Sequence, residues 1–424
     1  MRLWRQHLFD YKNNPVIEHS KPTTIENPYG WIVVFVSFII IAMCASSYYI
    51  TIVSLKSISA EFGWPRSFTS SAYSILFLGM GIGGIFMGWW SDRIGVALPV
   101  AIGIVITAIG TIVAGTSQGF VTFLIAHGIL MGLLGNSALF VPLLANITHW
   151  FDRRRGLAVG IVATGQGVAG TIWIPVFTRI TEAVGWRDTF LYYGVFLFCL
   201  LPATLILRRR PPDTSKPVTA STASVQTVNA LGMSSNLIVG LLSVAIVGCC
   251  ISMAIPTVHL VSHVTDLGFT RVQGAEVVAL TLACSIVSRL AWGWISDRIG
   301  GLLTLFIGSF LQAFAVFLFA LAQDITQLYL IGMFFGFAFG GIVPAYTIIM
   351  RHLLPPTSIG MRVGIVLLFG TIGMALGSWI GGQFFDLNGH YAYAFLVGVG
   401  ANIVNLVIIG FLNIRYRQLR PRPA

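Results

Sequence analysis

The sequence predicts an all-α integral membrane protein with twelve transmembrane helices in two parallel six-helix halves. Composition is the first reason, because 56% of the 424 residues are hydrophobic and only 9% are charged, whereas a soluble domain carries about 25% charged residues. Runs of about 20 apolar residues, the length that spans a bilayer, recur along the chain. The pentapeptide SDRIG also stands at both 91–95 and 296–300. A motif repeated 205 residues apart (296 − 91) indicates a duplicated protein.

The apolar runs give twelve expected spans, separated by short polar or charged segments. In chain order they are 30–54, 68–90, 96–115, 120–147, 156–178, 189–207, 236–262, 272–296, 302–322, 326–350, 362–385 and 391–414. Arginines cluster between spans at Arg153 to Arg155 and Arg208 to Arg210. Because cytoplasmic loops carry an excess of positive charge, we expect both termini in the cytoplasm.

The net charge of +11 follows from this topology, since arginine-rich loops lie on an anionic inner leaflet. A nucleic-acid partner is therefore not expected. The five cysteines fall in apolar spans, and their odd number argues against a disulfide framework. The chain has no nucleotide-binding motif, no HExxH motif and no recognisable catalytic cluster. We therefore expect a protein that is not an enzyme and has no metal site and no cofactor.

Polar segments divide the chain into five parts. We expect a cytoplasmic N-terminal segment at 1–28, a six-helix half at 29–207, a cytoplasmic linker at 208–235, a second six-helix half at 236–414 and a cytoplasmic tail at 415–424. The linker is rich in Ser, Thr, Pro and positive charge, which is typical of a flexible connection.

The duplication extends beyond the pentapeptide. Glu61 corresponds, at the same offset of 205, to Asp266, and Arg66 corresponds to Arg271. Gly88 and Trp89 likewise correspond to Gly293 and Trp294, so the second span matches the eighth. Two halves with the same orientation in the membrane are expected.

The repeated motif G-x-x-S-D-R-x-G leaves an Asp and an Arg just past the helix end in each half. These residues are Asp92, Arg93, Asp297 and Arg298. Such charges can pair with the neighbouring half or with helix termini and so form a latch that opens and closes. A solvated turn stopped by glycine is the alternative, but two copies at one offset favour a gate.

Two parallel six-span halves with this loop after the second span of each resemble the major facilitator superfamily, over about 30–414. The resemblance implies the major facilitator fold, whose halves rock around a site at the membrane midplane. The run WFDRRRGLAVG at 150–160 looks like the aromatic-Phe-x-Lys-Arg-Arg-x-Leu-Ala-x-Gly signature of monocarboxylate transporters. That wider clade includes bacterial monocarboxylate carriers and oxalate/formate exchangers. PYGW at 28–31 is similar to the clade's Gly-Trp signature, without its acidic residue.

Arg289 is the one arginine inside the eighth span. Insertion of a guanidinium into hydrocarbon costs about 3 kcal/mol, so such residues usually face a cavity or a partner. Its repeat position is Gly84, which indicates that the arginine is a specialisation of the second half. The resemblance implies that Arg289 binds the substrate carboxylate, for which a guanidinium offers two parallel donors. Snorkelling toward the inner interface is the alternative.

The chain departs from the clade in its other charges. The animal transporters carry an Asp one turn before this arginine and a Lys in the first span, whereas this chain has Ser285 and no first-span Lys. The eleventh span also lacks the Lys of the oxalate exchangers. One buried cation suits one carboxylate, so a monoanion is favoured over a dianion.

Several other polar residues are candidates for proton coupling or substrate binding. His259 is the first candidate proton site, because its side chain titrates near neutral pH, with a hydrogen-bonded packing role as the alternative. Glu276 and Asp266 are further candidates, although Asp266 mirrors Glu61, which favours a structural role. Asn136 is expected to donate to a carboxylate or to bond between helices. Family resemblance and amphipathic character also suggest cavity positions, with packing as the alternative, for Tyr48, Tyr49, Gln166 and Tyr346.

Three functions remain open. The first is a secondary carrier of a small monocarboxylate such as lactate or pyruvate, coupled to protons, monomeric and located in the bacterial inner membrane as the resemblance implies. The second is an exchanger or exporter of dicarboxylates or aromatic acids on the same fold. The third is a membrane sensor or intramembrane enzyme, against which the absence of a soluble domain and of catalytic motifs argues. We favour the first.

Overall fold

The computed structural model describes the whole chain except residues 1–27, 152–153, 210, 212–230, 355–358 and 420–424. Its described part contains twelve helices long and apolar enough to cross a membrane, and these confirm the predicted all-α membrane fold. Apart from Pro28, the expected N-terminal segment 1–28 lies outside the described residues, as does most of the linker 208–235.

The first six spans are built from eleven elements. They are α1 (Pro28–Cys44), α2 (Ser46–Phe62), α3 (Arg66–Ile94), α4 (Ala97–Thr116), α5 (Phe120–Ile125), η1 (Ala126–Gly135), η2 (Asn136–Ala138), α6 (Val141–Ile147), α7 (Arg155–Val184), α8 (Trp186–Leu197) and η3 (Phe198–Arg208). The last six spans are α9 (Ser235–Asp266), α10 (Arg271–Ile299), α11 (Gly301–Leu321), α12 (Ile325–Phe339) with α13 (Ile342–Leu353), α14 (Ile359–Asn388) and α15 (Ala392–Leu419). We call Pro28–Arg208 the N-terminal half and Ser235–Leu419 the C-terminal half.

The helix bounds repeat with the offset of the sequence motif. α3 and α10 each have 29 residues, and both their first and their last residues differ by 205 (271 − 66 and 299 − 94). Each ends at a glycine of positive φ, Gly95 at 89° and Gly300 at 85°, a conformation that favours glycine because it has no Cβ. The two N–H groups bond back to Ser91 and Ser296 at 2.9 Å. The duplication is therefore visible at the level of single helix caps.

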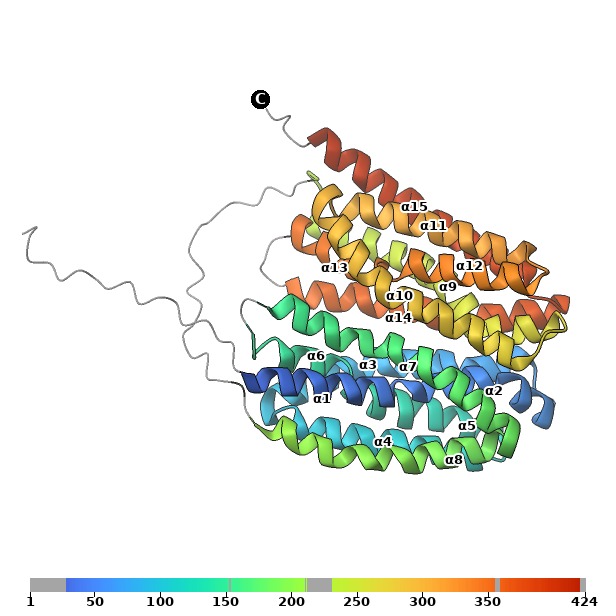
Figure 1. Ribbon diagram of the computed structural model, residues 1–424. Helices are drawn as coiled ribbons and strands as arrows, with labels where there is room; N and C mark the ends of the chain where they lie inside the picture. Colours follow the sequence, from blue (N-terminus) through green and yellow to red (C-terminus); the bar gives the residue numbers. More distant parts are fainter. Residues whose placement is uncertain (1–27, 152–153, 210, 212–230, 355–358, 420–424) are drawn as a thin grey trace, which may run out of the picture.

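The two halves lie side by side, with the blue-to-green helices on one side and the yellow-to-red helices on the other (Figure 1). Long helices of both halves run along the same direction, from the end where α1 begins to the end where α2 and α9 stop (Figure 1). We call these the terminal end and the distal end of the molecule. The halves meet along two seams, one between α3 and α14 and one between α7 and α10.

The fourth span covers Phe120–Ile147 as expected, but it is not one continuous α-helix. After α5 the chain winds as a π-helix, η1, for ten residues and then as a short 3-10 turn, η2, before α6 resumes the α-helix. A Cβ built at Gly132 would lie 2.5 Å from the carbonyl oxygen of Leu76, so glycine lets η1 pack directly on the backbone of α3. Pro142 stands at the start of α6, where its missing N–H costs nothing. The break brings Asn136 to the centre of the N-terminal half.

The two segments that carry the sequence signatures pack against each other. The rings of Tyr29 and Trp150 are 5.5 Å apart, and those of Trp31 and Phe151 are 4.9 Å apart. A Cβ at Gly30 would lie 2.9 Å from the ring of Phe151. The Gly-Trp segment in the first turn of α1 and the aromatic pair before α7 therefore form one aromatic cluster at the terminal end.

Candidate substrate site

The two seams bring the halves into direct contact near the middle of the molecule. On the α3–α14 seam, Ser74 donates a 2.7 Å hydrogen bond to the carbonyl of Ala375. On the α7–α10 seam, a Cβ at Gly167 would lie 2.7 Å from the side chain of Ile286, and one at Gly170 would meet Leu282. Small residues thus allow the helices of the two halves to approach closely.

The distal end is closed by charged pairs that join the halves. Arg66 of α3 forms an ion pair with Asp266 of α9 and donates a 2.9 Å hydrogen bond to the hydroxyl of Tyr391. Lys56 of α2 pairs with the same carboxylate at 2.9 Å. The guanidinium also lies 3.6 Å above the ring of Phe385. Asp266 therefore receives two cations from the opposite half.

The repeat partner of Asp266 behaves differently. Glu61 pairs with Arg187 at 2.8 Å and accepts a hydrogen bond from the indole of Trp186, both within the N-terminal half. Sequence position alone therefore does not give the partner of Asp266. The partners of Asp266 are determined by the packing of one half on the other.

A second carboxylate of the C-terminal half caps a helix of the N-terminal half. Asp386 accepts 2.8 Å hydrogen bonds from the backbone N–H groups of Arg66 and Ser67, the first residues of α3. The N-cap residue of α3 is Pro65, which provides no side-chain cap. Its repeat partner α10 caps itself through Thr270 in a capping box. Closure of the distal end thus satisfies N–H groups that α3 cannot satisfy itself.

Two glycines that continue the α7–α10 seam toward the terminal end have space beside them in the described structure. Gly160 lies on the same face of α7 as Ala163 and Gly167, yet no atom of another described residue lies within 4 Å of a Cβ built there. A Cβ built at Gly293 of α10 likewise has no atom of another described residue within 4 Å. At these two positions the seam is therefore less tightly packed than at Gly167.

The expected gate residues lie at the terminal end, where α3 and α10 end. Arg93 is exposed and lies 4.1 Å above the ring of Trp89, and Arg298 lies 3.6 Å above the ring of Trp294, four residues back on its own helix. Asp92 is exposed, and the side chain of Asp297 lies outside the described residues. Each arginine thus stacks on the tryptophan four residues before it, so the two halves repeat this contact.

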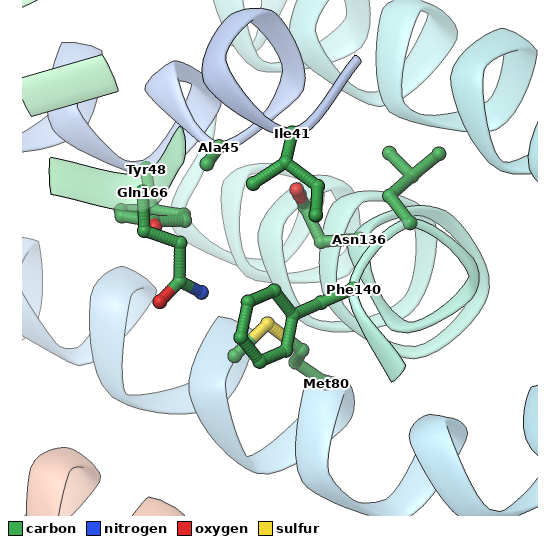
Figure 2. Close-up of a pocket in the computed structure, with 8 residues that line it drawn as sticks. Ile41, Ala45, Tyr48, Met80, Asn136, Phe140 and Gln166 are labelled. Carbon is green, nitrogen blue, oxygen red and sulfur yellow. The ribbon is translucent and has the colours of Figure 1, made fainter. Parts of the chain in front are cut away.

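A small cavity lies within the N-terminal half, lined by Ile41, Ala45, Tyr48, Met80, Asn136, Leu139, Phe140 and Gln166. Side chains nearly fill it, and its open volume is about 10 Å³, which is about the space that one water molecule needs. Figure 2 shows the ring of Phe140 and the side chains of Met80 and Gln166 directed into the same space.

Three residues that the sequence analysis gave as candidates for a binding site line this cavity, namely Tyr48, Asn136 and Gln166. Tyr49 stands beside them, since its ring is 4.7 Å from that of Tyr48 and its hydroxyl donates to the backbone oxygen of Gln166 at 3.3 Å. Tyr346 lies elsewhere, buried in the C-terminal half with its hydroxyl donating to Asn405 at 2.8 Å. The apolar lining residues were not expected, because an apolar side chain in an apolar span carries no sequence signal.

Arg289 crosses the seam between the halves beside this cavity. Its Nη1 donates a 3.0 Å hydrogen bond to the backbone carbonyl of Ala163, one turn before Gln166 on α7. Its Nε is shielded from solvent and has no hydrogen-bond partner among the described residues. The hydroxyls of Tyr48 and Tyr49 are close enough to interact electrostatically with the guanidinium. A shielded cation with an unused donor therefore faces the boundary of the two halves.

The candidate proton sites lie apart from the cavity. His259 is fully buried, with Nε2 2.8 Å from the carbonyl of Ser378 and its ring 5.1 Å from that of Tyr391. Glu276 accepts a 2.5 Å hydrogen bond from Tyr329 near the distal end of α10. His259 thus belongs to the packing of α9 on α14 behind the distal ion pairs, rather than to the cavity.

The chain is similar to known transporters in sequence and in structure. The family model of the Major Facilitator Superfamily matches residues 33–265 and 240–424. Monocarboxylate transporter 13 of Rattus norvegicus is 26% identical over 309 residues, which cover 72% of this chain and 71% of that protein. Monocarboxylate transporter 4 of Gallus gallus is 23% identical over 426 residues, covering 96% and 88%.

Among solved structures, one similar fold is a bacterial homolog of the human lysosomal transporter Spinster, crystallised in an inward-facing and occupied conformation. The TM-score is 0.69 at 16% sequence identity, and the alignment covers 94% of this chain and 100% of that one. At this level of identity the likeness concerns the fold.

Proposed function

The chain belongs to the Major Facilitator Superfamily, and the relatives described above are transporters. We propose that it carries a small monocarboxylate across the membrane by alternating access. Lactate and pyruvate represent the substrate class. The observation that carries this proposal is the state of Arg289, a guanidinium between the halves with a shielded Nε that has no partner in the described structure. Two relatives named monocarboxylate transporters support the substrate class.

The hydrogen bonding of Arg289 favours an anionic ligand. A guanidinium carries five N–H donors and binds a carboxylate through two parallel, charge-assisted bonds. Here Nη1 of Arg289 donates to the backbone carbonyl of Ala163. This carbonyl is neutral, so it compensates the positive charge of Arg289 only weakly. A substrate carboxylate would supply both the missing acceptor and the missing negative charge. No other cation stands among the described residues that line the cavity beside Arg289, so a monoanion matches this arginine better than a dianion.

The closed distal end and the less tightly packed terminal part of the α7–α10 seam fit one state of an alternating-access cycle. We propose that both termini are cytoplasmic and that the protein resides as a monomer in a bacterial inner membrane. The distal end, closed by Arg66, Asp266 and Asp386, is then the outer gate, and the structure corresponds to an inward-facing state. In the outward-facing state, the free faces at Gly160 and Gly293 would meet and the latch residues Asp92, Arg93, Asp297 and Arg298 would engage.

The test is uptake of a labelled panel of acids into proteoliposomes that contain the purified protein, with and without an inward proton gradient. We expect uptake of lactate or pyruvate above that of protein-free liposomes and little uptake of oxalate or succinate. Uptake of dicarboxylates in preference to monoacids would overturn the proposal.

We further propose that transport is coupled to protons through His259, with Asp266 and Glu276 as other acceptors. An inward proton gradient should then stimulate uptake, and His259→Gln should remove the stimulation while uptake at equilibrium exchange persists. A gradient response that is unchanged in His259→Gln would eliminate this histidine as the proton site. The control is His127→Gln, a buried histidine whose Nε2 and Nδ1 already bond Thr51 and the carbonyl of Phe123.

An anion exchanger on the same fold is the second candidate function. Ser285 stands where the animal monocarboxylate transporters carry an Asp, one turn before Arg289. The absence of that proton-coupling carboxylate favours an exchanger. Uptake that requires a counter-anion inside the liposome and ignores the proton gradient would identify an exchanger.

A further inference from the structure

The helix that carries Arg289 is fastened to the tenth span by two of its own side chains. Span ten is interrupted between α12 and α13. In a continuous α-helix the carbonyl of Phe337 would accept the N–H of the residue four positions later. At this interruption two side chains of α10 donate to that carbonyl, the indole Nε1 of Trp292 at 2.8 Å and the hydroxyl of Ser288. We call Ser288, Trp292 and the carbonyl of Phe337 the Phe337 clamp.

The clamp lies in a closely packed contact between α10 and span ten. Ser288 is fully buried and Trp292 is only 5% exposed. A Cβ built at Gly340 would lie 2.5 Å from the carbonyl oxygen of Ser285, and one at Gly341 would lie 2.2 Å from Cβ of Trp292. These glycines let the interruption of span ten lie directly on the backbone of α10. Span ten is therefore a fixed support for α10.

The side of α10 that faces α7 is held less firmly at the same level. A Cβ built at Gly293, the residue after Trp292, has no atom of another described residue within 4 Å. Toward α7, Nη1 of Arg289 donates one 3.0 Å hydrogen bond to the carbonyl of Ala163. A single hydrogen bond from a long, flexible side chain restrains the rotation of a helix weakly. Two buried donors on one carbonyl restrain it more strongly.

We propose that the Phe337 clamp positions Arg289 for the substrate by fixing the rotation of α10 about its own axis. Ser288 and Trp292 are four residues apart and share one face of the helix, and Arg289 lies about 100° around the axis from Ser288. A helix with its side chains is about 12 Å across, so a rotation of about 20° moves the tip of a side chain by about 2 Å. Such a shift breaks a hydrogen bond. This inference rests on the proposed function, because it takes the substrate carboxylate to be at Arg289.

The experiment measures KM and the maximal rate of lactate uptake into proteoliposomes for Trp292→Phe, Ser288→Ala and the double variant. Each single change leaves the carbonyl of Phe337 one donor, so we expect KM to rise about threefold, the lower end for a neutral hydrogen bond. The double variant removes both donors, and we expect KM to rise about 30-fold, more than the product of the single effects. The maximal rate per folded protein should stay within about twofold of the native rate, because the lost effect concerns binding.

Arg289→Lys separates positioning from simple packing. A lysine ammonium is a point charge with rotatable donors, whereas a guanidinium is a rigid fork that must match the plane of the carboxylate. In the Arg289→Lys background, the two clamp changes together should therefore raise KM no more than about threefold. The matched control is Trp379→Phe, the same substitution at a tryptophan of the C-terminal half that is 45% exposed, and it should leave KM unchanged.

The outcomes separate this inference from the proposed function. If the native protein takes up no monocarboxylate, or if Arg289→Gln transports as well as the native protein, the proposed function fails. If uptake depends on Arg289 but the clamp variants keep the native KM, the clamp does not position the guanidinium and the inference is overturned. An equal rise of KM in the native and the Arg289→Lys backgrounds would overturn it too. If the double variant does not fold, Trp292→Phe, which keeps an aromatic ring in place, decides by the same comparison.

Discussion

Arg289→Gln is expected to reduce uptake of a monocarboxylate at least about 30-fold while the protein still inserts and folds. Glutamine keeps a polar side chain on α10 and loses both the charge and the two-pronged donor. Truncation of one member of a buried, hydrogen-bonded charge pair typically costs 2–5 kcal/mol, and 2 kcal/mol corresponds to about 30-fold in affinity. Initial rates of uptake into proteoliposomes measure the effect, and size-exclusion elution of the purified variant checks the fold.

Two further variants separate recognition from simple charge. Arg289→Lys keeps the charge without the planar fork, so intermediate uptake is expected. Arg271→Gln removes an arginine from the first residue of the same helix, and uptake close to the native rate is expected. If Arg289→Gln transports as well as the native protein, the arginine has a structural role and its side chain merely reaches toward the interface.

Asp266→Asn is expected to open the distal end. The side chains of Arg66 and Asp266 are only 11% and 22% exposed, so this pair is more shielded from water than an ordinary surface ion pair. Loss of a fully buried partner costs 3–5 kcal/mol, whereas an exposed one costs at most about 1 kcal/mol. An intermediate cost of about 1–2 kcal/mol would raise the fraction of molecules with an open distal end roughly tenfold.

The opening can be followed with a cysteine in place of Ser70, which is fully buried at the α3–α14 seam. In a background without other cysteines, a membrane-impermeant maleimide added at the distal side should label Ser70→Cys about ten times faster when Asp266→Asn is also present. Glu61→Gln is the matched control, because Glu61 is the repeat partner of Asp266 but pairs within its own half. Equal labelling rates in Asp266→Asn and Glu61→Gln would show that the inter-half pair does not hold the gate.

The fold was predictable from the sequence for simple physical reasons. A membrane span needs about 20 apolar residues, and a duplicated motif fixes which spans correspond, so α3 and α10 begin and end as the offset of 205 requires. The π-helical winding of η1 was not predictable, because it depends on close packing of Gly132 against α3 rather than on local composition.

The candidate site was predictable only in its polar part. Asn136 attracts notice because polar groups are costly in an apolar span, whereas family resemblance and amphipathic character suggested Tyr48, and both line the cavity. Phe140 has no such signal, since the sequence of an apolar span does not tell which side chains face a cavity. The cap that Asp386 provides for α3 joins residues 320 positions apart, so only the packing of the two halves identifies it.

The most direct test of the central claim, that Arg289 binds the charge of the substrate, is competition by lactate and lactamide for uptake of labelled lactate. The two compounds have nearly the same shape, but lactamide carries no negative charge. The account predicts that unlabelled lactate inhibits uptake by the native protein at concentrations at which lactamide has no effect. Inhibition by lactamide as strong as that by lactate would mean that the site does not recognise a carboxylate, and the assignment of Arg289 would be wrong.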